Sequence, residues 1–260
     1  MIREKMIKRG MGDGGKFRWR SHEISRIEGL SDAVFAFAIT LLVVSLEVPK
    51  TFNELAETIH GFGAFAICFV LLFIVWYTQY KFFRRYGLQD TITVVLNGAL
   101  LFVVLFYVYP LKFLFTAVVD RLMGGHNEVR LPNGNVEAMI EGDQMGKLML
   151  LFGVGYFAVF AVFVLLYLHA YRKRAELELN KLEVFDTRNS IQESALNCMV
   201  ALISISLVVF GGPRYGGLAG LTYMLTGVVL GTHGTLMGRR RGELVKEFAA
   251  SSEAEQIQSS

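Results

Sequence analysis

Residues 26–49 read RIEGLSDAVFAFAITLLVVSLEVP, a stretch that begins with charged residues and then becomes almost wholly apolar. Arg26, Glu28 and Asp32 lie among its first seven residues, and Thr40 stands in the middle of the apolar part. A helix of about 20 apolar residues crosses the hydrocarbon core of a bilayer. The stretch therefore predicts a membrane-spanning helix with polar side chains at its beginning. It leaves open what those side chains bind and what the threonine does.

The rest of the chain repeats this apolar pattern. Five further segments contain no Asp, Glu, Lys or Arg, and they are residues 59–80, 91–111, 148–171, 194–213 and 215–238. Charged residues make up 19% of the chain, below the roughly 25% that is typical of soluble domains. We therefore expect an all-α membrane protein with six transmembrane helices per chain.

The distribution of Lys and Arg predicts the orientation of these helices, because basic residues gather in cytoplasmic segments. The segments on one side of the predicted spans, which include both termini, carry 20 of the 26 Lys and Arg residues, and the other side carries 6. Both termini of this multi-pass protein of the cell membrane are thus expected in the cytoplasm. Residues 1–25 would form a basic N-terminus, 26–238 the six-helix transmembrane domain and 239–260 a tail. The basic excess suits anionic lipid headgroups of the bilayer, so no nucleic-acid partner is expected.

Two connections between the predicted spans carry a recognisable pattern. Glycine, proline and asparagine mark an outer loop between the third and fourth spans, and residues 136–145 within it are a candidate short helix. On the opposite side, the charged segment 172–188 is expected to extend the fourth helix by several turns. Pro110 is a candidate kink in the third helix.

Two interpretations of the polar residues at the start of the first span are open. In the first, Ser31 or Asp32 caps the helix by accepting hydrogen bonds from free backbone N–H groups, and Arg26 marks the cytoplasmic side. In the second, all three residues bind neighbouring helices and anchor the first span, because polar groups near hydrocarbon need partners. Both interpretations can hold together. Trp76 in the second span and Asn97 in the third are the expected packing partners.

The pattern Arg26-x-x-x-Leu30-Ser31-Asp32, followed by AVFAFAITLLV, resembles the first-helix signature of the transmembrane protein 175 family of potassium channels. The usual form of that signature is Arg-x-x-x-Phe-Ser-Asp, so this chain differs at Leu30. Trp76 and the aromatic residues after it are similar to the tryptophan-containing second helix of the family. The resemblance implies a cation channel whose first helix lines the pore. Single-repeat prokaryotic members are tetramers, so a chain with six spans and no repeat is expected to form a homotetramer.

The resemblance also assigns residues to the pore wall. Counted from the aspartate of the signature, these are Phe37, Thr40 and Val44, with Leu41 beside them. The four residues lie at i, i+3, i+4 and i+7 and so share one face of a helix. In a fourfold assembly, the Thr40 hydroxyls would replace part of the hydration shell of potassium, and rings of Phe37 or Val44 would form hydrophobic constrictions. The alternative is that this face packs against neighbouring helices and that Thr40 bonds to its own backbone.

Other classes of protein find less support in the sequence. A secondary transporter of a small solute or ion is the alternative to a potassium channel, but the sequence shows no internal repeat of the kind that transporters use. A haem protein needs two facing histidines, whereas His60, His169 and His233 lie near the ends of different spans. We expect no enzyme activity, no cofactor and no metal site, with potassium passing only transiently.

Overall fold

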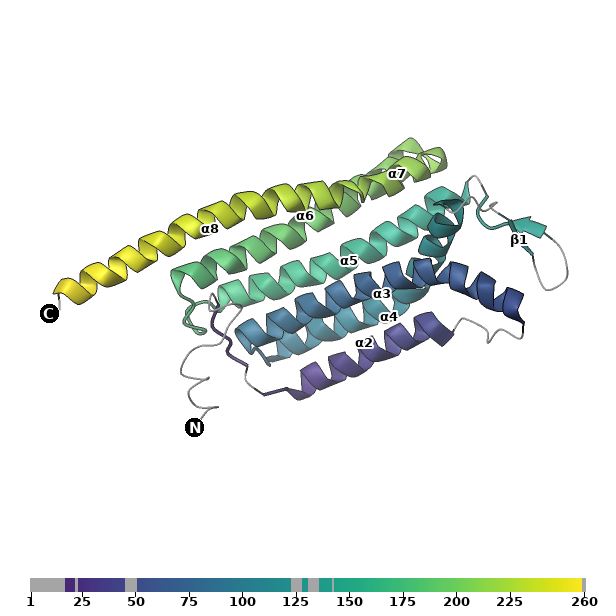
Figure 1. Ribbon diagram of the computed structural model, residues 1–260. Coiled ribbons are helices and arrows are strands. Elements are labelled where there is room, and N and C mark those ends of the chain that lie inside the picture. Colours follow the sequence, from purple (N-terminus) through teal and green to yellow (C-terminus); the bar gives the residue numbers. More distant parts are fainter. Residues whose placement is uncertain are drawn as a thin grey trace.

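The computed structural model describes residues 17–21, 23–44, 51–122, 128–130, 136–141 and 143–258. In this part of the chain, the α-helices form one elongated bundle (Figure 1). Their bounds are α2 Arg26–Val44, α3 Phe52–Tyr86, α4 Thr91–Leu122, α5 Gln144–Arg172, α6 Lys181–Gly211, α7 Gly216–Thr222 and α8 Leu225–Gln258. A short 3-10 helix precedes α7, and two short strands pair with each other, with the bounds η2 Pro213–Tyr215, β1 Glu128–Arg130 and β2 Val136–Ala138.

Four of the described helices, α3 to α6, are long and apolar enough to cross a membrane. They contain nearly all of the second to fifth predicted spans. α2 supplies 19 residues that include most of the predicted first span, and the end of that span, residues 45–48, lies outside the described residues. The chain is therefore an α-helical membrane protein, as predicted, whereas the number of six crossings stays a prediction.

The last predicted span, residues 215–238, is not one continuous helix. It passes through α7, is interrupted at Tyr223 and Met224, and resumes in α8. The Met224 N–H donates to the Leu221 carbonyl at 3.0 Å, a bond that reaches back only three residues and tightens the chain into a turn. α8 then continues to Gln258, so the segment predicted as a tail prolongs the same helix.

α4 connects the two halves of the bundle, because it contacts α2, α3 and α5. Leu100 and Val104 on α4 are almost fully buried in these contacts. The Tyr107 hydroxyl donates to the Phe152 carbonyl of α5 at 2.8 Å. A side chain at Gly155 of α5 would overlap the Tyr107 ring, so only glycine lets the two helices approach this closely.

The outer connection between α4 and α5 differs from its predicted structure. Residues 136–138 form strand β2 rather than part of a helix, and β2 pairs antiparallel with β1 in a register that places Glu128 opposite Ala138. Pairing of the two strands satisfies backbone groups that a short isolated helix would leave exposed at both ends. Pro110 lies inside α4, which continues to Leu122, and the kink stays a prediction.

The charged connection between α5 and α6 also differs from the prediction. α5 ends at Arg172, and the charged residues from 173 to 188 are divided equally between the connection and the first turns of α6. Asn180 caps α6, because its side chain accepts the Glu183 N–H at 2.9 Å while the Glu183 carboxylate accepts the Asn180 N–H at 3.1 Å. This capping box starts a new helix where the sequence suggested a continuation of the previous one.

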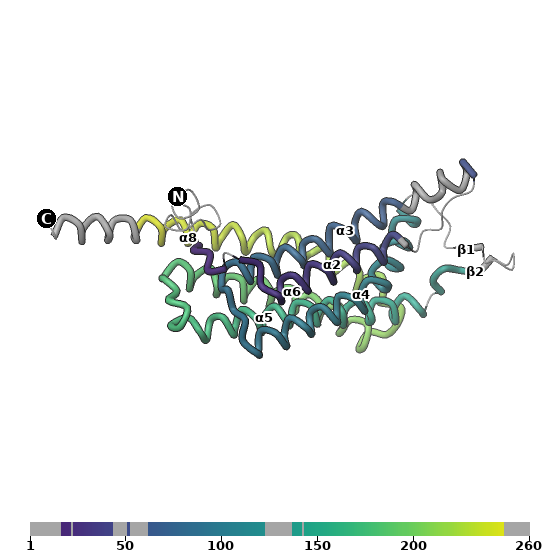
Figure 2. Tube along the Cα trace, turned by 90° about the horizontal axis from the view of Figure 1, so that it is seen from below, coloured from purple at the N-terminus to yellow at the C-terminus, as the bar shows by residue number. Residues whose placement is uncertain are grey.

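Residues 17–21, which we call the strap, lie at the end of the bundle where α5 connects to α6 (Figure 2). Phe17 is buried edge-to-face against Tyr86 of α3, with 5.6 Å between ring centroids. The Arg20 N–H donates to the Arg84 carbonyl at 3.0 Å, and Arg20 Nη2 lies 2.7 Å from Glu183 Oε2. Because the Glu183 side chain is only 1% exposed, this ion pair ties the strap to α6. The sequence predicted only a basic terminus here.

Candidate ion pathway and anchoring cluster

α2 has two chemically different faces. Ser31, Phe35, Ala38 and Leu42 are buried against the rest of the chain. The opposite face carries an outward stripe of exposed residues at helical spacing, namely Arg26, Leu30, Ala33, Phe37 and Thr40. Phe37 is 57% exposed and Leu30 60% exposed. The stripe therefore has no packing partner among the described residues of its own chain.

The predicted pore-lining residues occupy this stripe and its edge. Phe37 and Thr40 lie on the outward stripe, whereas Leu41 is half-buried and packs at the edge of the core. The side chain of Val44 lies outside the described residues. The structure thus leaves two of the four predicted residues accessible on the surface of the single chain.

The Thr40 hydroxyl donates to the Ala36 carbonyl of its own helix at 2.8 Å. This is the backbone contact that the packing alternative required. A hydroxyl that donates its proton to the helix still has oxygen lone pairs, which can accept a hydrogen bond or face a cation. The observed bond is therefore compatible with either role of Thr40.

A group of polar side chains, which we call the anchoring cluster, joins α2 to α3 and α4. Ser31 Oγ donates to the Ile27 carbonyl at 2.8 Å and accepts from Asn97 Nδ2 of α4 at 2.9 Å. The Asn97 side-chain carbonyl in turn accepts from Gln79 Nε2 of α3. Ser31, Gln79 and Asn97 are each at most 2% exposed, so three helices share one buried hydrogen-bonded chain.

Asp32 and Trp76 complete the anchoring cluster at its exposed edge. Trp76 Nε1 of α3 donates to Asp32 Oδ1 at 2.8 Å. The structure therefore brings Ser31 and Asp32 to the two residues named as packing partners, Asn97 and Trp76. Arg26 is exposed on the outward stripe and takes no part in the described hydrogen bonds of this cluster. Gln79 was not expected from the sequence, where it is one neutral side chain near the end of an apolar run.

The N-terminal cap of α2 lies earlier than either candidate in the sequence analysis. Ser25 Oγ accepts the Glu28 N–H at 3.2 Å, and the Glu28 carboxylate accepts the Ser25 N–H at 3.1 Å. Ser31 and Asp32 are therefore not caps, because both lie more than one turn inside the helix. The sequence contained the signal, since a serine followed three residues later by a glutamate is a capping box. Glu28 is buried and lies 3.9 Å from Arg84 Nε.

A lysine also joins α4 to α2 near the other end of the outward stripe. Lys112 Nζ donates to the Leu42 carbonyl at 2.8 Å. Leu42 lies in the last turn of α2, where backbone carbonyls have no partner within the helix. The contact fixes the end of α2 just as the anchoring cluster fixes its beginning.

A second polar group, outside the anchoring cluster, joins the ends of α4 and α5. Asp90 Oδ2 lies 2.6 Å from His169 Nε2 and 3.6 Å from Lys173 Nζ, and Asp90 Oδ1 accepts from the Thr93 hydroxyl. Burial by itself raises the pKa of Asp90. The bonds from Thr93 and His169, with the charges of His169 and Lys173, outweigh it and lower that pKa from 3.8 to about 2.

His169 and His233 each have a side-chain partner in the described part of the chain. His169 is engaged by Asp90, and His233 Nε2 lies 3.1 Å from Gln192 Oε1. Among the described residues there is also no group of three or more His, Cys, Asp or Glu residues placed to hold a metal ion.

Comparison with known proteins identifies the family. A family model described as the endosomal/lysosomal potassium channel TMEM175 matches residues 26–107, which contain α2, α3 and the first half of α4. A potassium channel of Marivirga tractuosa is 37% identical over 246 residues, which are 94% of this chain and 99% of that protein. The chain belongs to the TMEM175 family. The resemblance drawn from the first-helix signature is thereby confirmed.

Solved structures extend the likeness beyond the first three helices. The crystal structure of a variant of the potassium channel MtTMEM175, in complex with a nanobody fusion protein, has a TM-score of 0.75 and 38% identity. It covers 88% of this chain and all of that one. A lysosomal potassium-selective channel TMEM175 homolog from Chamaesiphon minutus shares the fold, with a TM-score of 0.52 and 20% identity. TMEM175 proteins are channels, so this chain is not an enzyme, as the sequence indicated.

Proposed function

We propose that the chain is one subunit of a homotetrameric potassium channel of the cell membrane, in which four α2 helices surround the pore. The observation that carries this proposal is the outward stripe of α2. It contains Phe37 and Thr40, and it has no packing partner among the described residues of the chain. Both ends of the same helix are held by polar contacts to α3 and α4. These contacts fix the rotation of α2 about its own axis. A pore wall requires such a fixed rotation, whereas a lipid-facing helix does not.

In this arrangement, permeation follows the potassium gradient and needs no resident cofactor. Hydrophobic rings narrow a pore and gate it by dewetting, and Phe37 is the largest side chain on the outward stripe. Thr40, one turn further along, would offer hydroxyl oxygens to the dehydrating ion. Leu41 and Val44 would complete the wall beside them. Ser31 and Asp32 would act as anchors, and Arg26 would mark the cytoplasmic entrance.

The topology belongs to the same proposal. α7 and α8 together would form the sixth crossing, which places both termini on the side that carries 20 of the 26 Lys and Arg residues. The break between α7 and α8 is also the feature that favours the alternative, a secondary transporter, because discontinuous helices form transporter sites. Single-channel current steps from the purified protein support a channel, and slow saturable flux would support a transporter.

The pore assignment is tested by Phe37→Ala in proteoliposomes. We expect a several-fold higher potassium flux and weaker selectivity against sodium, because the constriction becomes wider. Phe102→Ala is the matched control, since Phe102 is 72% exposed on α4 and is expected to face lipid. Equal fluxes of wild type, Phe37→Ala and Phe102→Ala, with normal assembly of all three, would remove Phe37 from the pore.

A further inference from the structure

Tyr171, one residue before the end of α5, holds two arginine side chains that we call the arginine pair. The Arg188 guanidinium of α6 donates to Tyr171 Oη through Nε at 3.1 Å and through Nη2 at 2.5 Å, and it lies 5.2 Å from the ring centre. Arg174, in the connection to α6, donates from Nη1 to the Tyr171 carbonyl at 3.2 Å. Its guanidinium lies 4.8 Å from the centre of the same ring. One tyrosine therefore orients two cations.

Both members of the arginine pair keep donors for a further partner. Arg174 and Arg188 are exposed. Within the part of the chain that the structure describes, Arg174 Nη2 and Arg188 Nη1 donate no hydrogen bond. A guanidinium is permanently charged and presents N–H groups in a fork that matches the oxygens of a phosphate. The arginine pair is therefore suited to an anionic phosphate group.

The carboxylates of the connection between α5 and α6 are engaged with other cations. Glu176 Oε2 lies 3.2 Å from Lys173 Nζ, and Glu178 Oε2 lies 3.9 Å from Arg18 Nη2 of the strap. Neither acid forms an ion pair with Arg174 among the described residues. The positive charge of Arg174 is thus left for a partner from outside the chain.

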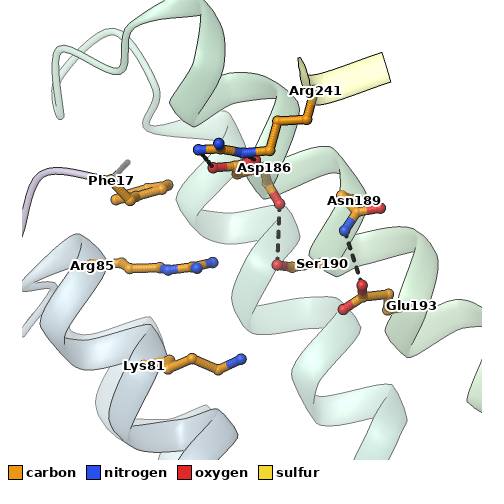
Figure 3. Close-up of a pocket in the computed structure, with 8 residues that line it drawn as sticks. All are labelled: Phe17, Lys81, Arg85, Asp186, Asn189, Ser190, Glu193 and Arg241. Atoms are coloured by element: carbon orange, nitrogen blue, oxygen red, sulfur yellow. Dashed lines mark hydrogen bonds and ion pairs between the residues drawn. The ribbon is translucent and has the colours of Figure 1, made fainter. Parts of the chain in front are cut away.

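The acids on α6 lie on the opposite side of that helix from Arg188. Figure 3 shows them in a cavity, where Asp186 binds Arg241 of α8 through bonds of 2.7 and 2.9 Å and Glu193 accepts from Asn189 at 2.9 Å. Successive residues of an α-helix are rotated by about 100°, so Arg188 leaves α6 about 200° from Asp186. The acids of α6 therefore do not offset the charge of Arg188.

The arginine pair lies at the level of lipid headgroups. Tyr171 is the last residue of the segment 148–171, which has no charged side chain, so its ring lies where an apolar span meets the polar boundary of the membrane. Arg188 binds the hydroxyl of that ring and lies at the same depth. α4 separates α5 and α6 from α2 (Figure 1), so this site is remote from the outward stripe and open to lipid.

We propose that Arg174 and Arg188, oriented by Tyr171, bind the headgroup phosphate of an anionic phospholipid. The bilayer holds that phosphate at the depth of the arginine pair, which raises its local concentration there. A lipid of net negative charge is favoured over a zwitterionic one, because two guanidiniums repel the ammonium of choline. Inorganic phosphate has the same binding group but lacks the membrane anchor. The inference does not depend on the proposed channel function.

The test measures which lipids stay bound to the purified full chain. The protein is exposed in detergent to an equimolar mixture of phosphatidylglycerol and phosphatidylcholine, and native mass spectrometry counts the retained lipids. We expect phosphatidylglycerol to be enriched at least about fivefold, the ratio that one basic residue near a membrane surface supplies. Arg174→Gln and Arg188→Gln should each remove most of this enrichment.

Two further variants separate a built site from general attraction between charges. Arg240→Gln removes a positive charge from an exposed position of α8 at the same end of the bundle, and it should keep the enrichment. Tyr171→Phe keeps the net charge but removes the hydroxyl that holds Arg188, so it should lower the enrichment. Thermal unfolding without added lipid identifies any variant that fails to fold.

Three results would overturn the proposal. The first is equal retention of the two lipids by the wild type. The second is an equal loss of enrichment in Arg188→Gln and Arg240→Gln, because retention would then follow net charge alone. The third uses inorganic phosphate, compared with chloride at equal ionic strength. If phosphate raised the melting temperature of the wild type but not of Arg188→Gln, without any preference between the lipids, the site would bind the free ion instead.

Discussion

At the scale of single residues, the anchoring cluster explains why polar side chains stand at the beginning of an apolar helix. Ser31, Gln79 and Asn97 are buried, and each satisfies another of the three. A buried polar group without a partner costs about 1–3 kcal/mol, so sliding or rotating α2 would leave two such groups unpaired. The cluster therefore fixes the position of α2 against α3 and α4 more strictly than apolar packing would.

This argument predicts the effect of Asn97→Leu. Leucine has a similar volume but leaves Gln79 without its acceptor and Ser31 without its donor. We expect the free energy of unfolding in detergent to fall by about 1–3 kcal/mol. Thr78→Val is the control, because Thr78 is half-buried and its hydroxyl donates to the Ile74 carbonyl of its own helix rather than to another helix. If the two variants lost equal stability, the cluster would be ordinary packing.

At the scale of the elements, the Asp90 group is expected to make the junction of α4 and α5 depend on pH. The folded-state pKa of Asp90 is about 2, below its ordinary 3.8, so the charged form stabilises the fold. That contribution is complete above about pH 4 and is lost as the pH falls through 2. Asp90→Asn should therefore lower the melting temperature at pH 7 and flatten its decline between pH 4 and 2. Glu141→Gln, on the far side of the bundle, should leave the decline unchanged.

The elements also show how far the sequence could be interpreted. Long runs without charged residues predict α3 to α6 well. Such runs mark membrane-spanning helices because a charged side chain is costly to place in hydrocarbon. The break at Tyr223 was not predicted, since it arises from local hydrogen bonding in a segment that is apolar throughout. The first turns of α6 were predicted as an extension of the preceding helix and not as the start of a new one. Its first turns are charged like a loop, and only the box of Asn180 and Glu183 reveals a helix.

The candidate site was predictable to a similar degree. Ser31 and Asp32 stand out because they are polar residues inside an apolar run, and Trp76 and Asn97 were named as their partners. Gln79 could not be found in this way, because its burial depends on how three helices meet. Residue spacing placed Phe37 and Thr40 on one face of α2, but spacing alone cannot show whether that face meets a neighbour in the same chain. The structure supplies this information.

At the scale of the whole molecule, the outward stripe of α2 requires a partner from outside the described chain. Lipid would cover Phe37 and Leu30 without cost, whereas a second, third and fourth copy of α2 would enclose a path for ions. The two possibilities differ in one physical property, which is whether water reaches Thr40. A membrane-impermeant reagent that modifies thiols measures that property directly.

Thr40→Cys is therefore the decisive variant. In the tetrameric channel, a charged, membrane-impermeant thiol reagent enters the pore, modifies Cys at this position and blocks potassium flux in proteoliposomes. Phe102→Cys should stay unmodified, because hydrocarbon excludes a charged reagent. Wild-type protein sets the background from Cys68, which is buried, and Cys198, which is partly buried within α6. If Thr40→Cys were as inert as Phe102→Cys while its flux stayed normal, no water path would run along α2, and the ions would have to cross elsewhere in the assembly.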